Sequence, residues 1–442
     1  MDAILGVRPE GADAPPQSEE ALALRFANRH DCDLRYVDAW HQWYRYDGRQ
    51  WVRDDTRSVF SLAREICHKE ACGTNEKARQ LALASAKTRS AVVSLASDDR
   101  KLAATVAQWD ADPWLLNSPS GMIDLRTGQC RPSRHDDYAT RMTAVGPNGE
   151  CPKWKTFLQQ AADGDQELVD YLQRVVGYCL TGFTTEHALF FFHGPGANGK
   201  SVFITTLAGL MGDYHRTAAV ETFTFSKTDR HPTDVAMLRG ARLVTAVETE
   251  EGKGWDEARI KNLTGGDKVT ARFMRQDFFE FLPQFKLLIA GNHRPGLRSV
   301  DEAMRRRLRL IPFDVIVPPD RRNPALTEEL KAEWPGILKW AIEGCLTWQN
   351  GGLCTPPKVA EATNEYIESE DVIQKWIDEC CTKSVESWVA VSALFGSWRS
   401  WATEAQEYIG SQRRFSQALI ERGFKPHRRD QRGFLGLALQ TY

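Results

Sequence analysis

The stretch FFFHGPGANGKSVF, from Phe190 to Phe203, decides the fold that we expect for the middle of this 442-residue chain. It fits the pattern G-x-x-x-x-G-K-[ST], with Gly194, Gly199, Lys200 and Ser201 in the required places. The leading phenylalanines predict a buried strand, and the residues from Lys200 onward predict a helix. Glycines allow several backbone N–H groups to point into one concavity, and the start of a helix makes that concavity more positive. The stretch therefore predicts a loop that binds the phosphates of a nucleotide.

The residue types in this loop predict separate roles. Lys200 is expected to reach the β- and γ-phosphates of a nucleoside triphosphate, and the Ser201 hydroxyl is expected to hold Mg²⁺. A glycine turn that matches by chance is the alternative, but the pattern is restrictive and lies between a predicted strand and a predicted helix. The residues expected around the nucleotide are Gly194, Pro195, Gly196, Ala197, Asn198, Gly199, Lys200, Ser201 and Val202.

Apolar runs and helical patterns alternate on both sides of this loop. The runs lie at 188–192, 243–247, 287–290 and 310–317, and turns or predicted helices bound each of them. Such runs are typical of strands in a buried, largely parallel sheet. Residues 153–182 predict a helical segment before the first run. The fold class predicted for the centre of the chain is therefore α/β with a parallel sheet.

Acidic residues follow the second run and are candidates for holding the metal and orienting water. In a parallel sheet, the carboxyl ends of the strands lie beside the phosphate loop. Glu248 directly follows the run and is the first choice as catalytic acid and Mg²⁺ ligand, and Glu250 is the second metal candidate. A solvated acidic turn is the alternative, and it fits Glu250 better than Glu248.

A polar amide follows the third run, and arginines precede the fourth. Asn292 ends the third run, where its amide is expected near the γ-phosphate or the attacking water, although asparagine is also common in turns. Arg305, Arg306 and Arg307 stand just before the fourth run. They are either a solvated basic face or an arginine finger, which stabilises charge on the γ-phosphate and, when a neighbouring subunit supplies it, requires a ring.

The order of these elements resembles that of the superfamily 3 helicases, and in particular the helicase family of phage and plasmid primase proteins, which includes poxvirus primase-helicases. The resemblance is carried by FFFHGPGANGKSVF, by ETEEGKGWDEARIKNLTGGDKVTARFMRQDFFEFLPQFKLLIAGNHRP and by DEAMRRRLRLIPF, and it extends upstream to PWLLNSPSGMIDLRTG and WYRYDGRQW. It implies a hexameric AAA+ ATPase that uses ATP and Mg²⁺, moves along single-stranded DNA and unwinds duplex. The family pattern has an aromatic residue where Arg305 stands, so Arg306 and Arg307 are the finger candidates.

The resemblance also implies that a hairpin before the third strand contacts DNA. The matching stretch is KVTARFMRQDFFEF, with strands expected at 269–274 and 278–282 and a tip at 275–277. Affinity for phosphates in such a channel is largely electrostatic. An ordinary charged hairpin is the alternative. The residues implied in DNA binding here are Lys268, Arg272 and Arg275.

The two ends of the chain carry separate expectations. Helical patterns at 371–382 and 412–423, followed by a basic hairpin, predict a winged-helix domain that contacts duplex DNA through Arg428 and Arg429, with a protein-docking module as the alternative. Near the N-terminus, Trp40 lies close to a predicted hairpin that turns at 47–48. Trp40 and its neighbour Trp43 are either base-stacking residues or a hairpin core, and the core is favoured.

The composition limits the class of protein. The formal net charge is −2, so nucleic-acid binding must come from local basic patches. The ten cysteines lack regular spacing, which indicates free thiols in a reducing compartment. The sequence shows no signal peptide and no apolar run long enough to span a membrane. These features predict a soluble, intracellular protein without a membrane partner. The resemblance to phage and plasmid primase proteins implies a location in the cytoplasm of a bacterial host cell and a gene carried by a phage, prophage or mobile element.

The predicted domain order follows from these patterns. It is a flexible tail at 1–20, an α+β domain at 21–150, a helical collar at 151–182, the AAA+ core at 183–320, a helical connector at 321–369 and the winged-helix domain at 370–442.

The leading hypothesis is an ATP-dependent DNA helicase, with 3′-to-5′ polarity implied by the resemblance, that acts on single-stranded and forked DNA. Asp31 and Asp33 have the spacing of a two-metal site, but the region is short for a polymerase fold, so any primase or polymerase is expected to be a separate partner. One alternative is an AAA+ initiator or loader that remodels origin DNA without processive unwinding. The other is a nucleotide-gated DNA-binding module.

Overall fold

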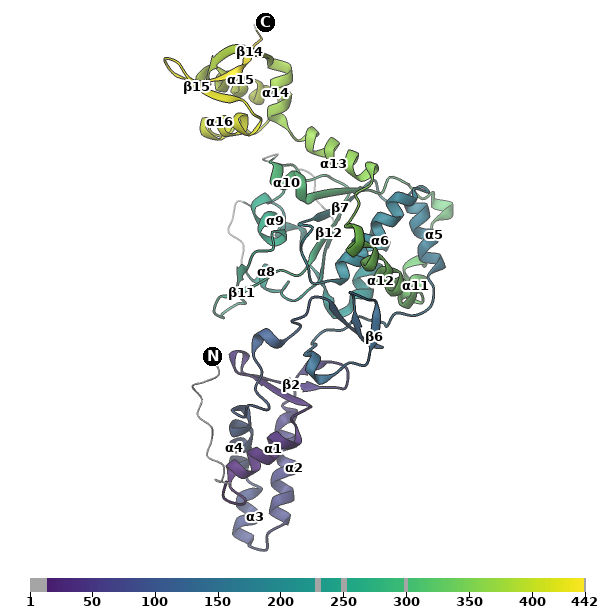
Figure 1. Ribbon diagram of the computed structural model, residues 1–442, viewed down its shortest axis with the longest axis vertical. Helices are drawn as coiled ribbons and strands as arrows, with labels where there is room; N and C mark the ends of the chain where they lie inside the picture. Colours follow the sequence, from purple (N-terminus) through teal and green to yellow (C-terminus); the bar gives the residue numbers. More distant parts are fainter. Residues whose placement is uncertain (1–13, 227–231, 248–252, 298–300, 441–442) are drawn as a thin grey trace.

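The computed structural model describes residues 14–226, 232–247, 253–297 and 301–440. Figure 1 shows three parts along the longest axis of the molecule. Helices α1 (Glu19–Arg29) to α4 (Ala86–Ser97) lie at one end, and helices α14 (Val372–Cys380) to α16 (Gln412–Glu421) lie at the other. A sheet with helices on both faces lies between them. No helix of the described ranges is both long enough and apolar enough to cross a bilayer.

The central sheet consists of β7 (Leu189–His193), β8 (His215–Thr217), β9 (Leu243–Val247), β12 (Lys286–Gly291) and β13 (Leu308–Pro312). Their order in space is β13–β7–β12–β9–β8, and every neighbouring pair is parallel. Along β7, Phe190 and Phe192 pack into one hydrophobic core, whereas Leu189 and Phe191 pack into another. Because both faces are covered, the strand is apolar at nearly every position. This arrangement confirms the predicted α/β class with a parallel sheet.

Helices separate the two cores from solvent. The core of Phe190 and Phe192 includes Trp154, Tyr171 and Trp340, which come from α5 (Pro152–Ala161), α6 (Gln166–Leu180) and α12 (Trp334–Gly351). The helix α7 (Lys200–Met211) also packs there, and α11 (Leu326–Lys331) lies against α7. The opposite core takes side chains from α8 (Thr233–Ala236), α9 (Glu257–Thr264), α10 (Glu302–Arg307) and α13 (Pro357–Ser369).

The N-terminal part combines a helical core with a small antiparallel sheet. Helices α2 (Ser58–Cys72) and α3 (Lys77–Leu83) pack with α1 and α4, and β1 (Leu34–Val37) pairs with β2 (Gln42–Tyr46), which pairs with β3 (Trp51–Arg53). The predicted turn is present, because Asp47 Oδ1 accepts hydrogen bonds from the N–H groups of Arg49 and Gln50, both at 2.8 Å. Trp43 is 8% exposed and belongs to the helical core, as expected.

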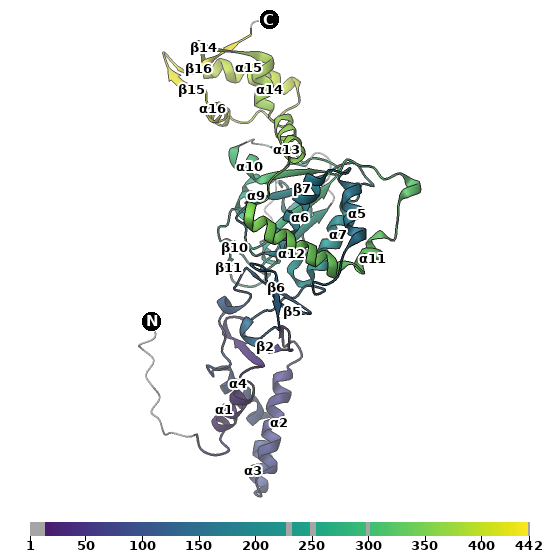
Figure 2. The same ribbon diagram turned by 45° about the vertical axis from the view of Figure 1, so that its right-hand side comes forward.

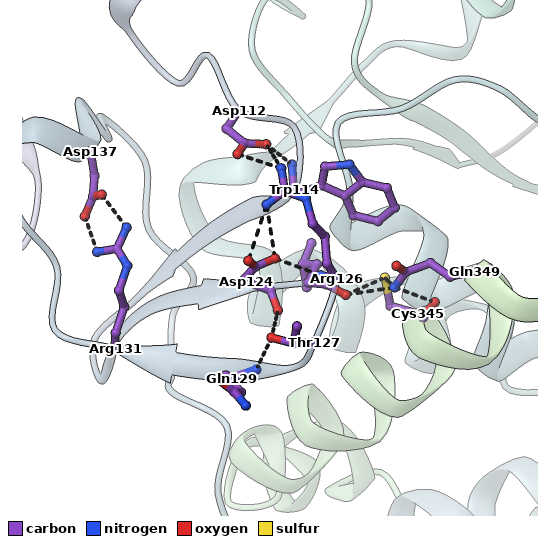
Figure 3. Close-up of polar contacts among 11 residues, drawn as sticks. Asp112, Trp114, Asp124, Arg126, Thr127, Gln129, Arg131, Asp137, Cys345 and Gln349 are labelled. Atoms are coloured by element: carbon purple, nitrogen blue, oxygen red, sulfur yellow. Dashed lines mark hydrogen bonds and ion pairs between the residues drawn. The ribbon is translucent and has the colours of Figure 1, made fainter.

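A second small sheet joins the N-terminal part to the central part. It consists of β4 (Leu115–Ser118), β5 (Gly121–Asp124) and β6 (Gln129–Arg131). Figure 3 shows how it lies against α12: Gln349 Nε2 donates to the Leu125 carbonyl at 2.8 Å. On its outer side, Arg126 bridges the carboxylates of Asp112 and Asp124 at 2.9 and 3.3 Å. Leu116, Ile123 and Leu125 belong to the same buried core as Phe190 and Phe192 of β7.

The C-terminal part packs three helices against a three-stranded sheet. The helix α15 (Val391–Glu404) lies with α14 and α16 around Trp376, Trp398 and Phe415. The strands β14 (Cys381–Ala390), β15 (Lys425–Arg428) and β16 (Arg432–Leu439) are antiparallel, with β16 in the middle. The predicted basic hairpin is β15–β16.

Several predicted boundaries are wrong in detail. The segment 153–182 is two helices, because Asp163 has a left-handed backbone (φ 58°) and the Asp165 side chain accepts from Leu168 N to cap α6. The fourth run forms a strand only at Leu308–Pro312, because residues after Phe313 leave β7 and run beside the phosphate loop, where Val317 N donates to Ala197 O. The helical pattern at 371–382 ends at Cys380, where β14 begins.

Candidate functional site

The glycine-rich loop turns sharply between β7 and α7. Gly194 (φ 155°), Ala197 (φ 60°) and Gly199 (φ 90°) all have positive φ. A Cβ atom at Gly194 would lie 2.1 Å from the Phe313 carbonyl oxygen, and one at Gly199 would lie 2.7 Å from the Phe157 ring. Glycine is therefore required at both positions, because the loop passes close to β13 on one side and to α5 on the other.

Lys200 is held inside this loop. Its side chain is 6% exposed. The Nζ atom donates to the carbonyl oxygens of Gly194 at 2.7 Å and Pro195 at 3.0 Å. Burial lowers the pKa of Lys200, and the nearby Asp314 carboxylate opposes that shift. The ammonium group thus lies among protein oxygens at the first turn of a helix.

Two asparagines complete the surroundings of Lys200. Asn198 Oδ1 accepts from Lys200 Nζ at 3.0 Å, and Asn198 Nδ2 donates to the Phe313 carbonyl. Asn292 Oδ1 accepts from the same Nζ at 3.1 Å. Asn292 reaches the loop because it follows β12, whose Gly291 pairs with His193 at the end of β7. The loop and Asn292, predicted from separate motifs, therefore lie together.

His193 and Asp314 also lie at this edge of the sheet and are not among the predicted site residues. Burial lowers the pKa of His193, and the positive charges of Arg294 and Lys200 add to that shift. Asp314 opposes it. His193 is the last residue of β7, so the strand-end signal that identifies Asn292 also identifies His193. Asp314 lies two residues after β13 and inside the apolar run 310–317, so this signal does not identify it.

The outer side of the loop faces solvent and an apolar pocket. Pro195, Gly196, Ala197 and Ser201 are exposed. A pocket of about 540 Å³ opens beside the loop. It is lined by α5, by the loop and by the segment from Val315 to Leu326. The lining includes Phe157, Ala161, Asn198, Val202, Val317 and Leu326.

Glu248 and Glu250 lie outside the described residues. The strand that precedes them, β9, ends at Val247, which pairs with Ala290 of β12. Their roles as catalytic acid and metal ligand stay predictions.

The three arginines of α10 lie at the opposite edge of the sheet from the loop. Leu308, directly after α10, pairs with Leu189 at the start of β7, and the loop follows the other end of that strand. At about 3.3 Å per residue, the length of β7 separates the two edges by about 15 Å. Arg306 is exposed, with 71% of its side chain accessible, whereas Arg307 Nε donates to Thr264 Oγ1 at 3.2 Å.

The β-hairpin that is expected to contact DNA is present, but its strands are shorter than expected. β10 (Val269–Ala271) pairs with β11 (Phe279–Phe281). The turn begins early, because Gln276 N donates to Phe273 O and Arg275 has a left-handed backbone (φ 59°). Lys268 pairs with Glu280 at 4.0 Å, and Arg272 lies 4.6 Å from the Phe278 ring.

Arg428 and Arg429 lie at the far end of the molecule on the β15–β16 hairpin. All four residues of β15 are exposed, and the Arg429 guanidinium lies 5.2 Å from the Trp388 ring. The predicted site residues therefore form separate groups: the loop with Asn292, the arginines of α10, the β10–β11 hairpin and the C-terminal hairpin. Figures 1 and 2 show α10 on the side of the central part that faces the C-terminal part, and β11 on the side that faces the N-terminal part.

Two family models match the chain. A family described as “D5 N terminal like” matches residues 23–162, and a family of unknown function, DUF5906, matches residues 192–307. The first covers the N-terminal part and α5. The second runs from β7 to α10 and so contains the phosphate loop, the hairpin and the arginines.

Curated relatives of the chain are named as helicases. It is 26% identical over 326 residues to “Putative helicase L207/L206” of Acanthamoeba polyphaga mimivirus, which covers 66% of this chain and 33% of that protein. It is 27% identical over 258 residues to “Putative helicase 022R” of Frog virus 3 (isolate Goorha), which covers 53% of this chain and 26% of that protein. The chain thus spans a third or less of the length of these relatives.

A solved structure shares the fold. The apo C-terminal region of NrS-1 aligns with a TM-score of 0.55 and 9% identity, over 97% of this chain and 100% of that chain. At this identity the likeness concerns the fold alone. Together with the family models and the viral relatives, it confirms the resemblance that the sequence motifs carry.

Proposed function

We propose that this chain, which belongs to the superfamily 3 family of phage and viral primase-helicases, is an ATP-dependent DNA helicase. It is proposed to act as a hexameric AAA+ ring on single-stranded and forked DNA, with 3′-to-5′ polarity, in the replication of a phage or mobile element. A separate primase or polymerase is its proposed partner, and the cytoplasm of a bacterial host cell is its proposed location.

The observation that carries this proposal is the placement of Lys200 between the loop and Asn292. Its ammonium group donates to oxygens from both elements, at 2.7 to 3.1 Å. The donor set fits a triphosphate, because a cation, a helix N-terminus and an exposed Ser201 hydroxyl converge on the loop. Lys200 would contact the β- and γ-phosphates, Ser201 with Glu248 and Glu250 would hold Mg²⁺, and bound Mg²⁺ would neutralise phosphate charge.

The pocket beside the loop supports a nucleotide over inorganic phosphate as the ligand. Its walls include Phe157, Ala161, Val202 and Leu326, and apolar walls of this kind suit a planar base. Asn198 and Gly199 line the pocket and also belong to the phosphate loop, so a base placed there would be connected to phosphates at the loop.

The position of α10 supports a ring. Arg306 and Arg307 lie about one strand length from the loop of their own chain, too far for a guanidinium to touch a phosphate there. In a ring, the same edge faces the loop of the next subunit. Arg306 is the better finger candidate, because its side chain is largely exposed and pairs with Glu302 of the same helix, whereas Arg307 bonds to Thr264 of α9.

DNA is proposed to contact the chain at two places. Lys268, Arg272 and Arg275 of the β10–β11 hairpin would line the channel of the ring. The C-terminal part is proposed to be a winged-helix domain that binds duplex through Arg428 and Arg429, which is supported by its three helices and its exposed basic β15–β16 hairpin.

The test is a strand-displacement assay on a forked duplex, with ATP hydrolysis measured in parallel. Lys200→Ala should lower DNA-stimulated ATP hydrolysis by about 10²–10³-fold and abolish displacement, because it removes a charge that the loop holds in place. Lys331→Ala, an exposed lysine of α11 paired with Glu328, is the matched control and should retain both activities.

The results of these assays distinguish the candidate functions from one another. Hydrolysis that persists in Lys200→Ala would refute the assignment of the loop. Hydrolysis without displacement in the wild type would favour an initiator or loader. DNA binding without hydrolysis would favour the nucleotide-gated module.

A further inference from the structure

A cleft separates the N-terminal part from the β10–β11 hairpin. Two adjoining cavities, of about 990 Å³ and 690 Å³, form it. Both cavities are lined by Trp40, Tyr44 and Val106 from the N-terminal part and by Arg239 and Phe273 from the central part. Because they share these residues, the two cavities lie next to each other, and the two together are named the cleft.

Arg239 lies at the centre of the cleft and contacts both walls. Its guanidinium lies 5.3 Å from the Trp40 ring and 5.2 Å from the Phe279 ring. An arginine placed between two aromatic rings keeps its charge, and it pairs with an anion through the N–H groups at the edge of its guanidinium, because the rings cover the flat faces. The cleft therefore has a cation at the point where the N-terminal part and the hairpin come closest.

Aromatic and apolar side chains line both walls: Trp40 and Tyr44 are partly buried on the N-terminal wall, and Phe278 and Leu282 are exposed on the opposite wall. On the N-terminal wall, the rings of Trp40 and Tyr44 are 5.8 Å apart, and Tyr44 is 4.8 Å from Trp109. On the opposite wall, Phe278 is 60% exposed and Leu282 is 54% exposed. Exposed apolar surface that gathers in one cleft marks a binding surface.

The charge of the cleft is opposite to that of the whole chain. The net charge of the chain is −2. The cleft is lined by Arg53, Arg141, Arg216, Arg239 and Arg275, against Asp110, Asp277 and Glu280. Positive charge interleaved with aromatic rings suits a ligand with both phosphates and planar bases.

We propose that this cleft binds single-stranded nucleic acid, with bases stacked on Trp40 and Phe278 and phosphates paired with Arg239 and Arg275. The inference rests on the proposed function for the class of ligand and deepens it, because it makes the N-terminal part the second wall of the DNA path. Trp40, unlike the buried Trp43, is then a stacking residue.

The experiment measures equilibrium binding by the full chain without nucleotide, using fluorescence anisotropy. One probe is a labelled oligothymidylate, and the other is an abasic oligonucleotide with the same number of phosphates. Base stacking contributes about five- to one-hundredfold in affinity per base. Trp40→Ala should therefore weaken oligothymidylate binding by about tenfold while abasic binding changes by less than about twofold. Trp40→Phe keeps a ring and should restore most of the affinity.

A second variant and a control distinguish a specific loss of binding from a loss of folding. Phe278→Ala removes an exposed ring from the opposite wall and should show the same selective loss. Leu81→Ala, which alters a side chain of α3 that is 68% exposed and does not line the cleft, should bind both probes as the wild type does. Thermal unfolding of each variant checks that it is folded.

Three results would overturn the inference. The first is a wild-type protein that does not prefer oligothymidylate to the abasic probe. The second is a folded Trp40→Ala or Phe278→Ala variant that binds oligothymidylate as the wild type does. The third is competition for the site by polyglutamate but not by unlabelled oligothymidylate. Because nucleotide is absent, a chain that fails to hydrolyse ATP but shows selective loss would refute the proposed function and leave this inference standing.

Discussion

At the scale of single residues, Lys200 shows how the loop holds a charge before a ligand arrives. Burial lowers its pKa, yet four protein oxygens surround its ammonium group. Such hydrogen bonds offset the cost of removing a charge from water. If the loop binds a triphosphate as proposed, Lys200 is already held at the loop, and phosphate oxygens would replace some of these protein acceptors, because an ammonium group has three N–H donors.

The two asparagines that contact Lys200 are expected to have different roles. Asn198 ties the loop to the Phe313 carbonyl, so Asn198→Ala should loosen the loop and weaken nucleotide affinity by about tenfold, the effect of losing about 1.4 kcal/mol of binding energy. Asn292→Ala leaves the loop intact and should lower the hydrolysis rate more than the affinity. Titration with a fluorescent ATP analogue and steady-state hydrolysis measure the two quantities.

Asn350→Ala, at the end of α12, is the control for this pair, because its side chain bonds only to the nearby Leu346 carbonyl among the contacts described. The assignment of separate roles fails if Asn198→Ala and Asn292→Ala lower affinity and rate in the same proportion.

At the scale of elements, the parallel sheet decides which groups share an edge. Strand ends that carry Asn292 and the loop lie together, whereas α10 precedes β13 and lies at the other end of the strands. A chain of this topology therefore presents the glycine-rich loop and the arginines of α10 at opposite ends of the strands. If the loop binds a triphosphate as proposed, an arginine of α10 would reach it from a neighbouring chain.

This geometry predicts that Arg306→Ala acts in trans. A ring that contains variant subunits should lose hydrolysis at the loops of their neighbours, so an equal mixture should retain well below half of the wild-type rate. An arginine finger contributes about 10³–10⁵-fold to the rate. Hydrolysis is measured across a series of mixing ratios. Arg309→Ala is not a suitable control because it lies within β13; Arg64→Ala, an exposed residue of α2 that lines none of the cavities described above, should give a linear mixing curve.

A linear curve for Arg306→Ala would contradict the trans role. If Arg307→Ala alone gives the curved response, the finger is Arg307, despite its bond to Thr264.

Elements also show how far the sequence predicts this structure. Four strands of the central sheet are predictable, because each is a continuous apolar run bounded by turns. β8 is not, because its three residues, His215–Thr217, carry no apolar signal. The strand β14 follows α14 without a glycine or proline between them, so the helical pattern hides where the helix ends.

The contacts of the site also divide into those that the sequence predicts and those that it does not. Lys200 follows from motif spacing, and Asn292 follows from its position after a strand. The bond from Asn198 to Phe313 depends on how closely the end of β13 approaches the loop, which local sequence does not encode. Trp40 and Trp43 share one short segment, and the packing of α1 against β2 buries Trp43 while Trp40 stays partly buried in another cluster.

At the scale of the whole molecule, buried cations join the N-terminal and central parts. Arg242 is 3% exposed and donates to the Leu180 carbonyl of α6 and to the Leu115 carbonyl of β4, both at 2.7 Å. Its guanidinium also lies 4.7 Å from the Tyr214 ring. Tyr214 in turn accepts a hydrogen bond from Asn117 N at 3.0 Å. A charged residue just before an apolar run resembles a solvent-facing strand end, so the sequence does not reveal this connection.

Arg242→Met is therefore expected to destabilise the contact between the two parts, because two buried carbonyl oxygens lose their donor. Leaving each unpaired costs about 1–3 kcal/mol, so the total loss should be about 2–6 kcal/mol. Arg126→Met is the matched control: its ion pairs with Asp112 and Asp124 are partly exposed, and their loss should cost less than about 1 kcal/mol. Urea unfolding followed by tryptophan fluorescence measures both, and the Arg242 variant should show an earlier transition. Equal midpoints for the two variants would mean that the parts are held together by their apolar contacts, with the buried guanidinium contributing little.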